Sequence, residues 1–244
     1  FLAVTNSIDE QIEAMDSVCR MVHRLKKTPR RVYLSVDEWN IWYRAREGEH
    51  VDGRGKFAPH LLEEVYNLED ALVAAGFLNS FIRHADSVKI ANLAQIVNVI
   101  APILTRGDDL VRQTIFYPIE MYARRREGKA LQFAVEGPSY TSKHYGEVNY
   151  LDASAIVNGN RLHVFATNRS TDEDMDLTVA VGGADVAQVV DAEIVTGKDP
   201  QAANTFDQPD LVTSQPFPEI AVGGAGATLK MPPLSVVAAT LELG

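Results

Sequence analysis

Two adjacent carboxylates, Asp37 and Glu38, follow a short apolar segment and stand directly before a group of aromatic side chains. Residues 32–36 are mostly β-branched, aromatic or aliphatic, which is typical of a strand buried on both faces. In an α/β barrel the carboxyl ends of the strands carry catalysis, and a packed strand holds an acid in a fixed position. Both tryptophans of the chain, Trp39 and Trp42, lie here, and flat aromatic rings stack on the C–H faces of sugars. The pattern therefore predicts carbohydrate chemistry.

A plainer interpretation of the same residues is a helix N-cap. Asp directly after a strand often accepts hydrogen bonds from the free N–H groups of a following helix. On residue types alone, Asp37 fits that role as well as it fits a catalytic rim, and the two interpretations stay open.

The segment resembles a known motif. Residues 37–43 read Asp-Glu-Trp-Asn-Ile-Trp-Tyr, which is similar to the nucleophile motif at the end of barrel strand seven in glycoside hydrolase family 51, the α-L-arabinofuranosidases. The resemblance covers nearly the whole chain. Four further stretches carry it: 91–103, 112–118, 203–209 and 229–235.

The resemblance implies a fold of α/β plus all-β class. Residues 1–128 would form the last part of a (β/α)8 TIM barrel, with strands seven and eight and their flanking helices. Residues 129–244 would form an antiparallel, jelly-roll-like β-sandwich. Since a closed barrel needs eight strands and at most two are indicated here, the chain is expected to supply only the carboxyl-terminal portion.

The resemblance also assigns site residues. Glu38 is expected to be the catalytic nucleophile, Gln95 to bind ring hydroxyls of the furanose, and Trp42 to form an apolar wall of the sugar subsite. An amide suits the first contact because it both donates and accepts hydrogen bonds. Asp37 is expected to be structural. Without the motif, Gln95 would read as a helix cap or solvent-facing residue and Trp42 as core.

The second catalytic carboxylate is missing from the sequence. The family places its acid/base Glu in an Asn-Glu pair on an earlier strand, and no Asn-Glu pair occurs in this chain. The chain also opens at Phe1 rather than Met. We expect it to be the carboxyl-terminal half of a longer enzyme, cleaved or partial, with the amino-terminal half as its partner.

The function implied is that of a retaining, exo-acting α-L-arabinofuranosidase. It would release terminal arabinofuranosyl residues from arabinose-containing oligosaccharides and polysaccharides by double displacement. The resemblance also implies a homo-oligomer. Two alternatives stay open: a non-catalytic sugar-binding or structural fragment, and a xylosidase or endoglucanase specificity on the same barrel.

The composition of the chain disfavours several other classes of function. A formal net charge of -10 disfavours nucleic acid as a partner. No run approaches the roughly 20 apolar residues of a membrane span, and the single cysteine, Cys19, allows no intrachain disulfide. A cytoplasmic location is the default expectation. The six His residues are scattered without zinc-site spacing, so we expect no metal and no cofactor.

Local patterns predict the elements that position these residues. A capping box of Ser7 and Glu10 indicates a first helix that ends at Pro29, and a type I′ turn is predicted at residues 157–160. A polar loop at 44–56 is expected to line the pocket. Further helices are expected at 61–84 and at 110–126, the latter bent or interrupted at Pro118. Further strands are expected at 88–91, 155–157, 162–166, 177–181, 186–190 and 234–241.

Overall fold

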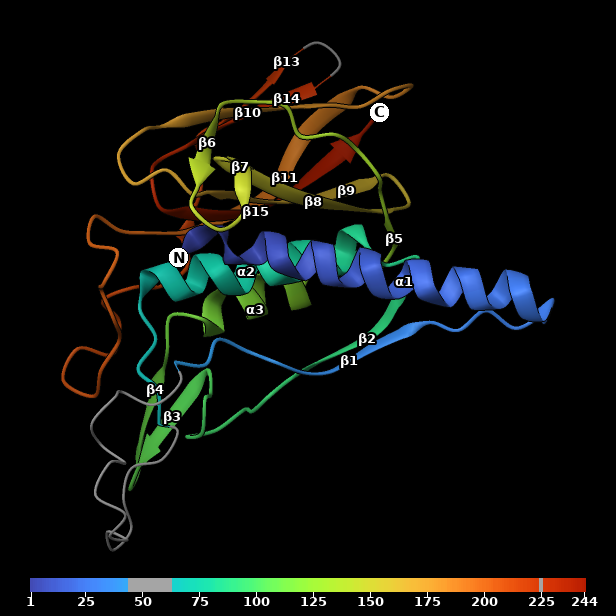
Figure 1. Ribbon diagram of the computed structural model, residues 1–244. Helices are drawn as coiled ribbons and strands as arrows, with labels where there is room; N and C mark the ends of the chain where they lie inside the picture. The colour runs from blue at the N-terminus through green and yellow to red at the C-terminus, as the bar shows by residue number, and fades with distance from the viewer. Residues whose placement is uncertain (44–62, 224–225) are drawn as a thin grey trace, which may run out of the picture.

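The computed structural model describes residues 1–43, 63–223 and 226–244. Three α-helices lie between a pair of parallel strands and a set of antiparallel sheets (Figure 1). The predicted loop at 44–56 lies outside the described residues.

The helices and strands have the following bounds. The helices are the 3-10 helix η1 (Leu2–Thr5), α1 (Asn6–Lys26), α2 (Leu68–Arg83) and α3 (Phe116–Ala123). The strands are β1 (Leu34–Trp39), β2 (Val88–Leu93), β3 (Ile103–Arg106), β4 (Asp109–Arg112), β5 (Lys129–Ala130), β6 (Ser139–Ser142), β7 (Gly146–Asn149), β8 (Leu151–Asn158), β9 (Arg161–Asn168), β10 (Met175–Ala180), β11 (Val186–Thr196), β12 (Gln215–Pro216), β13 (Ile220–Gly223), β14 (Gly226–Met231) and β15 (Ser235–Leu243).

Strands β1 and β2 pair in parallel and form a two-stranded sheet. Leu34, Val36 and Trp39 of β1 pack against the apolar cluster built around α2, whereas Ser35 and Asp37 are exposed. The prediction of a strand buried on both faces is therefore wrong for the described residues, because only one face of β1 meets a helix layer. These residues form no closed barrel.

The first helix begins differently from the prediction. Its N-cap is Thr5, and the Ser7 hydroxyl donates to the backbone oxygen of Val4 at 2.7 Å. The predicted Ser7–Glu10 capping box is wrong, because η1 already places the chain in a helical conformation before Ser7. The helix ends as expected near Pro29, with Lys27 in the left-handed conformation.

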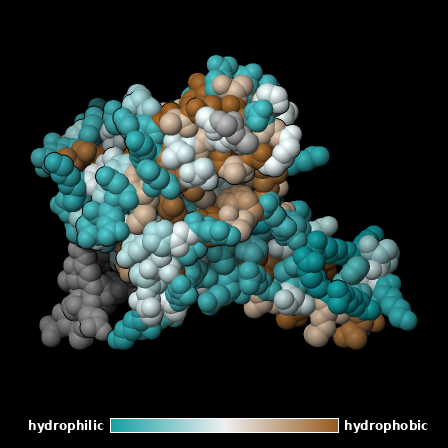
Figure 2. All heavy atoms as spheres, turned by 90° about the horizontal axis from the view of Figure 1, so that it is seen from above, coloured by the Kyte–Doolittle hydropathy of each residue, from teal (hydrophilic) through white to brown (hydrophobic). Residues whose placement is uncertain are grey.

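The apolar stripe of α1 packs against the rest of the protein only in the first half of the helix. Ile12 is buried, but Met15, Val18, Val22 and Leu25 are exposed on one side of the helix. In the space-filling view, hydrophobic side chains gather at the end of the arm that α1 forms (Figure 2). An apolar stripe of this length on an exposed helix is typical of a surface that another element covers.

Helix α2 is buried on two sides, which explains its largely apolar sequence. One side packs against β1 and β2, and the other against the antiparallel sheet. Gly76 is needed where η1 crosses α2, because a Cβ there would lie 2.4 Å from Cγ2 of Thr5. The helix starts at Leu68, later than the predicted residue 61, because Asn67 and Asp70 form a capping box.

The predicted helix at 110–126 is wrong in its first part. Residues 103–112 form the hairpin β3–β4, which turns at Gly107 with φ of +61°. Helix α3 starts only at Phe116, so Pro118 lies in its first turn. Proline is tolerated there because the first-turn N–H groups have no partner within the helix.

The second half of the chain is rich in antiparallel strands. A six-stranded sheet has the order β12-β11-β15-β9-β8-β5, and a three-stranded sheet has the order β10-β14-β13. Residues from both sheets share one apolar core, including Ile194, Leu229 and Val237. The sheet-rich architecture expected of this half is confirmed.

The β8–β9 hairpin forms as predicted, but with another turn. Asn158 pairs with Arg161 across the turn, so Gly159 and Asn160 are its central residues. Only Gly159 has a positive φ, of +60°. The turn is therefore of type II′ rather than type I′, since type I′ needs a positive φ at both central positions.

Buried polar contacts join the helices to the six-stranded sheet. Arg83 of α2 donates to Asp152 of β8 and to Asp9 of α1, each at 2.7 Å. Asn79 also donates to Asp152, at 2.9 Å. The two halves of the chain are thus held in one orientation by charge-assisted hydrogen bonds.

Among the described helices, none is long and apolar enough to cross a membrane.

Candidate active site

Glu38 lies on the exposed face of the β1–β2 pair, close to the end of β1. Val36 pairs with Ala91 and Trp39 with Leu93, so two residues of β1 oppose one residue of β2. This β-bulge explains how Val36 and Trp39, three positions apart, both face the helix layer. Asp37 and Glu38 fill the bulge and are both exposed. The fold therefore presents Glu38 away from the core and does not bury it.

Gln95 follows the end of the neighbouring strand. It is exposed and lies two residues beyond β2, after a cis Ala94–Gln95 peptide bond. The N–H of Ala94 donates to the backbone oxygen of Trp39 at 3.0 Å, which extends the pairing past the bulge. Parallel pairing thus places the segments that carry Glu38 and Gln95 at the same end of adjacent strands.

Asn40 ties these two strand ends together, although no separate role was expected for it. Its side-chain amide donates to the backbone oxygens of Ala94, at 2.8 Å, and of Ile100. Its side-chain oxygen accepts from the N–H of Ile41 at 2.8 Å. All three bonds fix the backbone on either side of the site.

Trp39 anchors the same strand end to the helix layer. Its ring meets Phe77 and Phe81 of α2 edge-on, with centroid distances of 6.2 and 5.4 Å. Trp39 is therefore a packing residue, which separates it from Trp42.

Trp42 is 55% exposed and is not a core residue. Its two neighbours are held: Ile41 is buried, and the Tyr43 hydroxyl donates to the carboxylate of Asp70. An exposed indole between two fixed neighbours is available to a ligand at this end of the strands.

Asp70, a buried carboxyl group beside the site, was not identified from the sequence. Burial raises its pKa to about 6, against the opposing effect of the hydrogen bond from Tyr43. Burial and the nearby Asp70 charge also raise the pKa of Tyr43. The signal was present in the sequence as Asn67-x-x-Asp70, a capping-box pattern before an apolar run.

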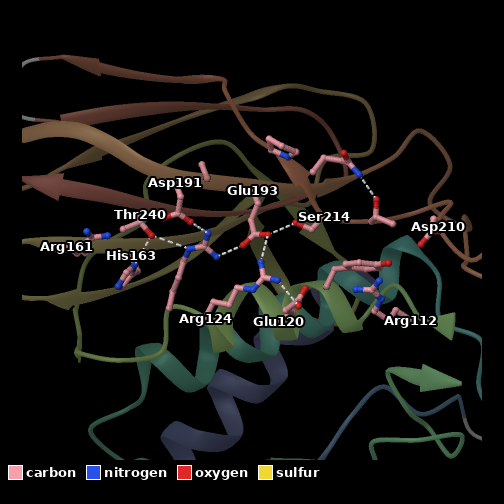
Figure 3. A pocket seen from close by; sticks show the side chains of 16 residues that line it. Arg112, Glu120, Arg124, Arg161, His163, Asp191, Glu193, Asp210, Ser214 and Thr240 are labelled. Atoms are coloured by element: carbon pink, nitrogen blue, oxygen red, sulfur yellow. Dashed lines mark hydrogen bonds and ion pairs between the residues drawn. The ribbon is translucent and has the colours of Figure 1, made fainter. Parts of the chain in front are cut away.

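A polar hollow of about 630 Å³ lies elsewhere, between α3 and the six-stranded sheet (Figure 3). Its charges are largely paired: buried Arg125 donates to Glu193 at 2.6 Å and to Asp191, and Arg124 meets Glu120 at 2.7 Å. Paired charges of this kind join α3 to the sheet. Neither this hollow nor two others found among the described residues is lined by Glu38, Gln95 or Trp42.

No metal site emerges from the described residues, where no group of three or more His, Cys, Asp or Glu side chains could hold an ion. At the strand ends, the predicted site residues supply a carboxylate, an amide and an indole.

Known proteins resemble this chain in sequence and in structure. The family profile of the α-L-arabinofuranosidase C-terminal domain matches residues 37–235. An intracellular exo-α-(1→5)-L-arabinofuranosidase of Streptomyces lividans is 37% identical over 238 residues, which is 96% of this chain and 36% of the relative. A similarly named enzyme of Bacillus subtilis is 33% identical over 215 residues, 87% of this chain and 43% of the relative.

Solved structures give the same result. A family 51 α-L-arabinofuranosidase from Bifidobacterium longum superposes with a TM-score of 0.89 at 30% identity, covering 99% of this chain and 48% of that one. The family 51 enzyme of Xanthomonas axonopodis pv. citri gives 0.83 at 28% identity, covering 98% and 46%. The chain spans between about a third and a half of the length of these proteins. It therefore belongs to the family 51 α-L-arabinofuranosidases and corresponds to their carboxyl-terminal part.

Proposed function

We propose that the protein to which this chain belongs is a retaining, exo-acting α-L-arabinofuranosidase. Its substrates would be oligosaccharides and polysaccharides that carry terminal arabinofuranosyl residues. Family membership supports the activity, and the names of the relatives support the exo-action on arabinofuranosides. The observation that carries the proposal is the parallel pairing of β1 with β2, which brings the segments of Glu38 and Gln95 to one edge.

In the proposed reaction, the Glu38 carboxylate attacks C1 of the arabinofuranosyl group. The bond from C1 to the leaving oxygen breaks, and that oxygen takes a proton from a second carboxyl group. Water then hydrolyses the glycosyl ester on Glu38, with the second group acting as base. Retaining enzymes need the two carboxyl groups about 5 Å apart. Gln95 would bind sugar hydroxyls, and Trp42 would cover an apolar face of the ring.

The second carboxyl group would come from the amino-terminal half of the same enzyme. We propose that residues 1–128 are the last part of a (β/α)8 barrel and that residues 129–244 form the appended sandwich. Two features support this: β1 has an exposed face that carries Glu38, and α1 has an exposed apolar stripe. Upstream strands and helices packed on both would close the site and bury the stripe.

The test uses the full-length enzyme with an aryl α-L-arabinofuranoside. Glu38→Gln should lower kcat by at least about 10³-fold, because the amide cannot act as the nucleophile. Glu10→Gln, which changes an exposed glutamate on α1 in the same way, should leave kcat unchanged. A mechanism-based furanoside inhibitor should label Glu38, as read by peptide mass spectrometry. A label on another residue, or a Glu38→Gln enzyme with normal turnover, would refute the assignment.

Specificity and assembly need separate tests. Rates on arabinofuranosides, xylosides and cello-oligosaccharides would separate the proposed activity from xylosidase or endoglucanase action. A homo-oligomer is proposed from the resemblance alone, and light scattering of the full-length enzyme tests it. A cytoplasmic location is proposed because both relatives described above are named intracellular.

A further inference from the structure

The backbone on the amino-terminal side of Trp42 is fixed by a buried contact. Ile41 is 6% exposed, and its backbone oxygen accepts a hydrogen bond of 2.7 Å from the hydroxyl of Tyr66, which is fully buried. The backbone N–H of Tyr66 in turn donates to Gln113 at 2.9 Å. Ile41 is therefore held by a residue that follows it by 25 positions in the chain.

The carboxyl-terminal side of Trp42 is fixed by a second contact. The Tyr43 hydroxyl donates to Oδ1 of Asp70, which is fully buried. Oδ2 of Asp70 accepts from the N–H of Asn67 at 2.8 Å, and the N–H of Asp70 donates to the Asn67 side chain at 3.1 Å. Asp70 therefore holds Tyr43 with one oxygen and caps α2 with the other.

Both contacts lead to the start of α2, and between them stands an indole that is 55% exposed. A core residue would be held by its own burial, but Trp42 has little burial of its own. The contacts that hold the chain on either side of Trp42 come from Tyr66 and Asp70. A ligand wall needs this kind of support, because a side chain that is free to move must be ordered on binding.

We propose that Tyr66 and Asp70, with Tyr43 as the link, are positioning residues that hold Trp42 as the wall of the sugar subsite. The proposal rests on the function proposed above. None of the three residues needs to touch the sugar, and each acts through the backbone of residues 41–43. Their loss should raise KM while kcat stays near its original value, because Glu38 is on β1, and the position of β1 is set by its pairing with β2.

The arrangement also gives the substrate affinity a pH dependence. Tyr43 and Asn67 hydrogen-bond to the Asp70 carboxyl group, and Tyr66, Glu64 and Glu69 interact with it electrostatically. Burial raises the pKa of Asp70 to about 6. Above that pH the carboxylate accepts both the Tyr43 and the Asn67 hydrogen bonds. Below it, one oxygen becomes a hydroxyl and an acceptor is lost. KM should therefore rise as the pH falls through 6.

The experiment measures kcat and KM of the full-length enzyme on an aryl arabinofuranoside from pH 5 to pH 7.5. Tyr43→Phe and Tyr66→Phe should each raise KM about tenfold at pH 7.5, the loss expected for a hydrogen bond that is charge-assisted or buried. Asp70→Asn should raise KM to a similar extent at pH 7.5, and its ratio to the wild-type KM should shrink towards pH 5. Tyr33→Phe is the matched control, because its ring is 47% exposed and its cation–π contacts survive the change.

Two combinations separate positioning from a general loss of structure. Tyr43→Phe should have no further effect in a Trp42→Ala enzyme, because both changes remove the same wall. Tyr43→Phe and Asp70→Asn should be non-additive for the same reason. Circular dichroism and the melting temperature identify any variant that fails to fold, and Tyr43→Phe leaves the α2 cap in place.

The proposal is overturned if Tyr43→Phe and Tyr66→Phe leave KM unchanged in folded enzyme. It is also overturned if their effects add fully to that of Trp42→Ala. A ratio for Asp70→Asn that is the same at pH 5 and pH 7.5 overturns the pH dependence of KM. Labelling of Glu38 keeps the two proposals apart. Normal labelling with an unchanged KM overturns only the positioning role, whereas labelling elsewhere overturns the proposed function.

Discussion

The side-chain amide of Asn40 donates a hydrogen bond of 2.8 Å to the backbone oxygen of Ala94, the residue directly before Gln95. This bond spans 54 positions of the sequence. It joins the end of the strand that carries Glu38 to the segment that carries Gln95. The geometry of the proposed site therefore depends on a residue that need not touch the sugar.

Replacing Asn40 tests that dependence. Asn40→Ala removes the donor to the oxygens of Ala94 and Ile100 and should destabilise the enzyme by about 1–3 kcal/mol. KM should rise because Gln95 is no longer held. Thermal unfolding and steady-state kinetics of the full-length enzyme measure the two effects. Asn40→Asp keeps the acceptor for Ile41 but has no amide donor, so it should be no better than Asn40→Ala. Full rescue by Asp would contradict the role of the donor.

Arg83 should be a costly charge to remove from the junction between α2 and the six-stranded sheet. Arg83→Met leaves the carboxylates of Asp9 and Asp152 without their main partner and should cost about 3 kcal/mol. Arg124→Met is the control, because that side chain is 57% exposed and its pair with Glu120 should contribute less than about 1 kcal/mol. Denaturant titration compares the two, and equal losses would show that the junction does not depend on Arg83.

The His84–Asp9 pair should stabilise the fold mainly in mildly acidic solution. The hydrogen bond to Asp9 raises the pKa of His84 above 6.5. Burial raises the pKa of Asp9, but hydrogen bonds from His84 and Arg83 outweigh burial and lower it below 3.8. A raised His pKa gives stability that is fully present below pH 6.5 and lost as the pH rises through the folded-state value. A lowered Asp pKa gives stability that is lost only in strong acid.

The variant His84→Gln cannot carry the charge at any pH. Its melting temperature should therefore lie further below that of the wild type at pH 5 than at pH 9. A gap of the same size at both pH values would show that the charge of His84 contributes nothing.

The two possible helix caps should differ in their contribution to stability. Asn67→Ala removes a side chain that accepts from the N–H of Asp70, and should cost about 1 kcal/mol. Ser7→Ala should cost less than about 0.5 kcal/mol, because Ser7 lies inside the helical run and caps nothing. Melting temperatures measure both changes. A larger loss for Ser7→Ala would support the capping box that the sequence suggested.

Much of the proposed site could be predicted from the sequence, because the types of its residues can be read directly along the chain. The motif at 37–43 identified the family, and the switch to short alternating segments identified the sheet-rich second half. The hairpin at 157–160 was also found, since Asn-Gly restricts the chain locally. The turn type was not, because it depends on the twist and register of the paired strands.

The errors share a cause. The Ser7 cap, the helix expected from residue 110 and the burial of both faces of β1 all depend on what packs beside each segment. Local propensity is a weak guide where tertiary contacts compete with it. Only the folded chain places η1 ahead of Ser7, or turns residues 103–112 back as a hairpin.

By itself, the sequence determined which side chains are available for the proposed roles of nucleophile, hydroxyl-binding amide and apolar wall. The tertiary structure decided how they are held: a bulge exposes Glu38, Asn40 reaches the backbone before Gln95, and Asp70 and Tyr66 fix the residues around Trp42. These contacts join residues that are 25 to 54 positions apart. Their geometry follows from strand register and helix packing, which no local pattern of residues specifies.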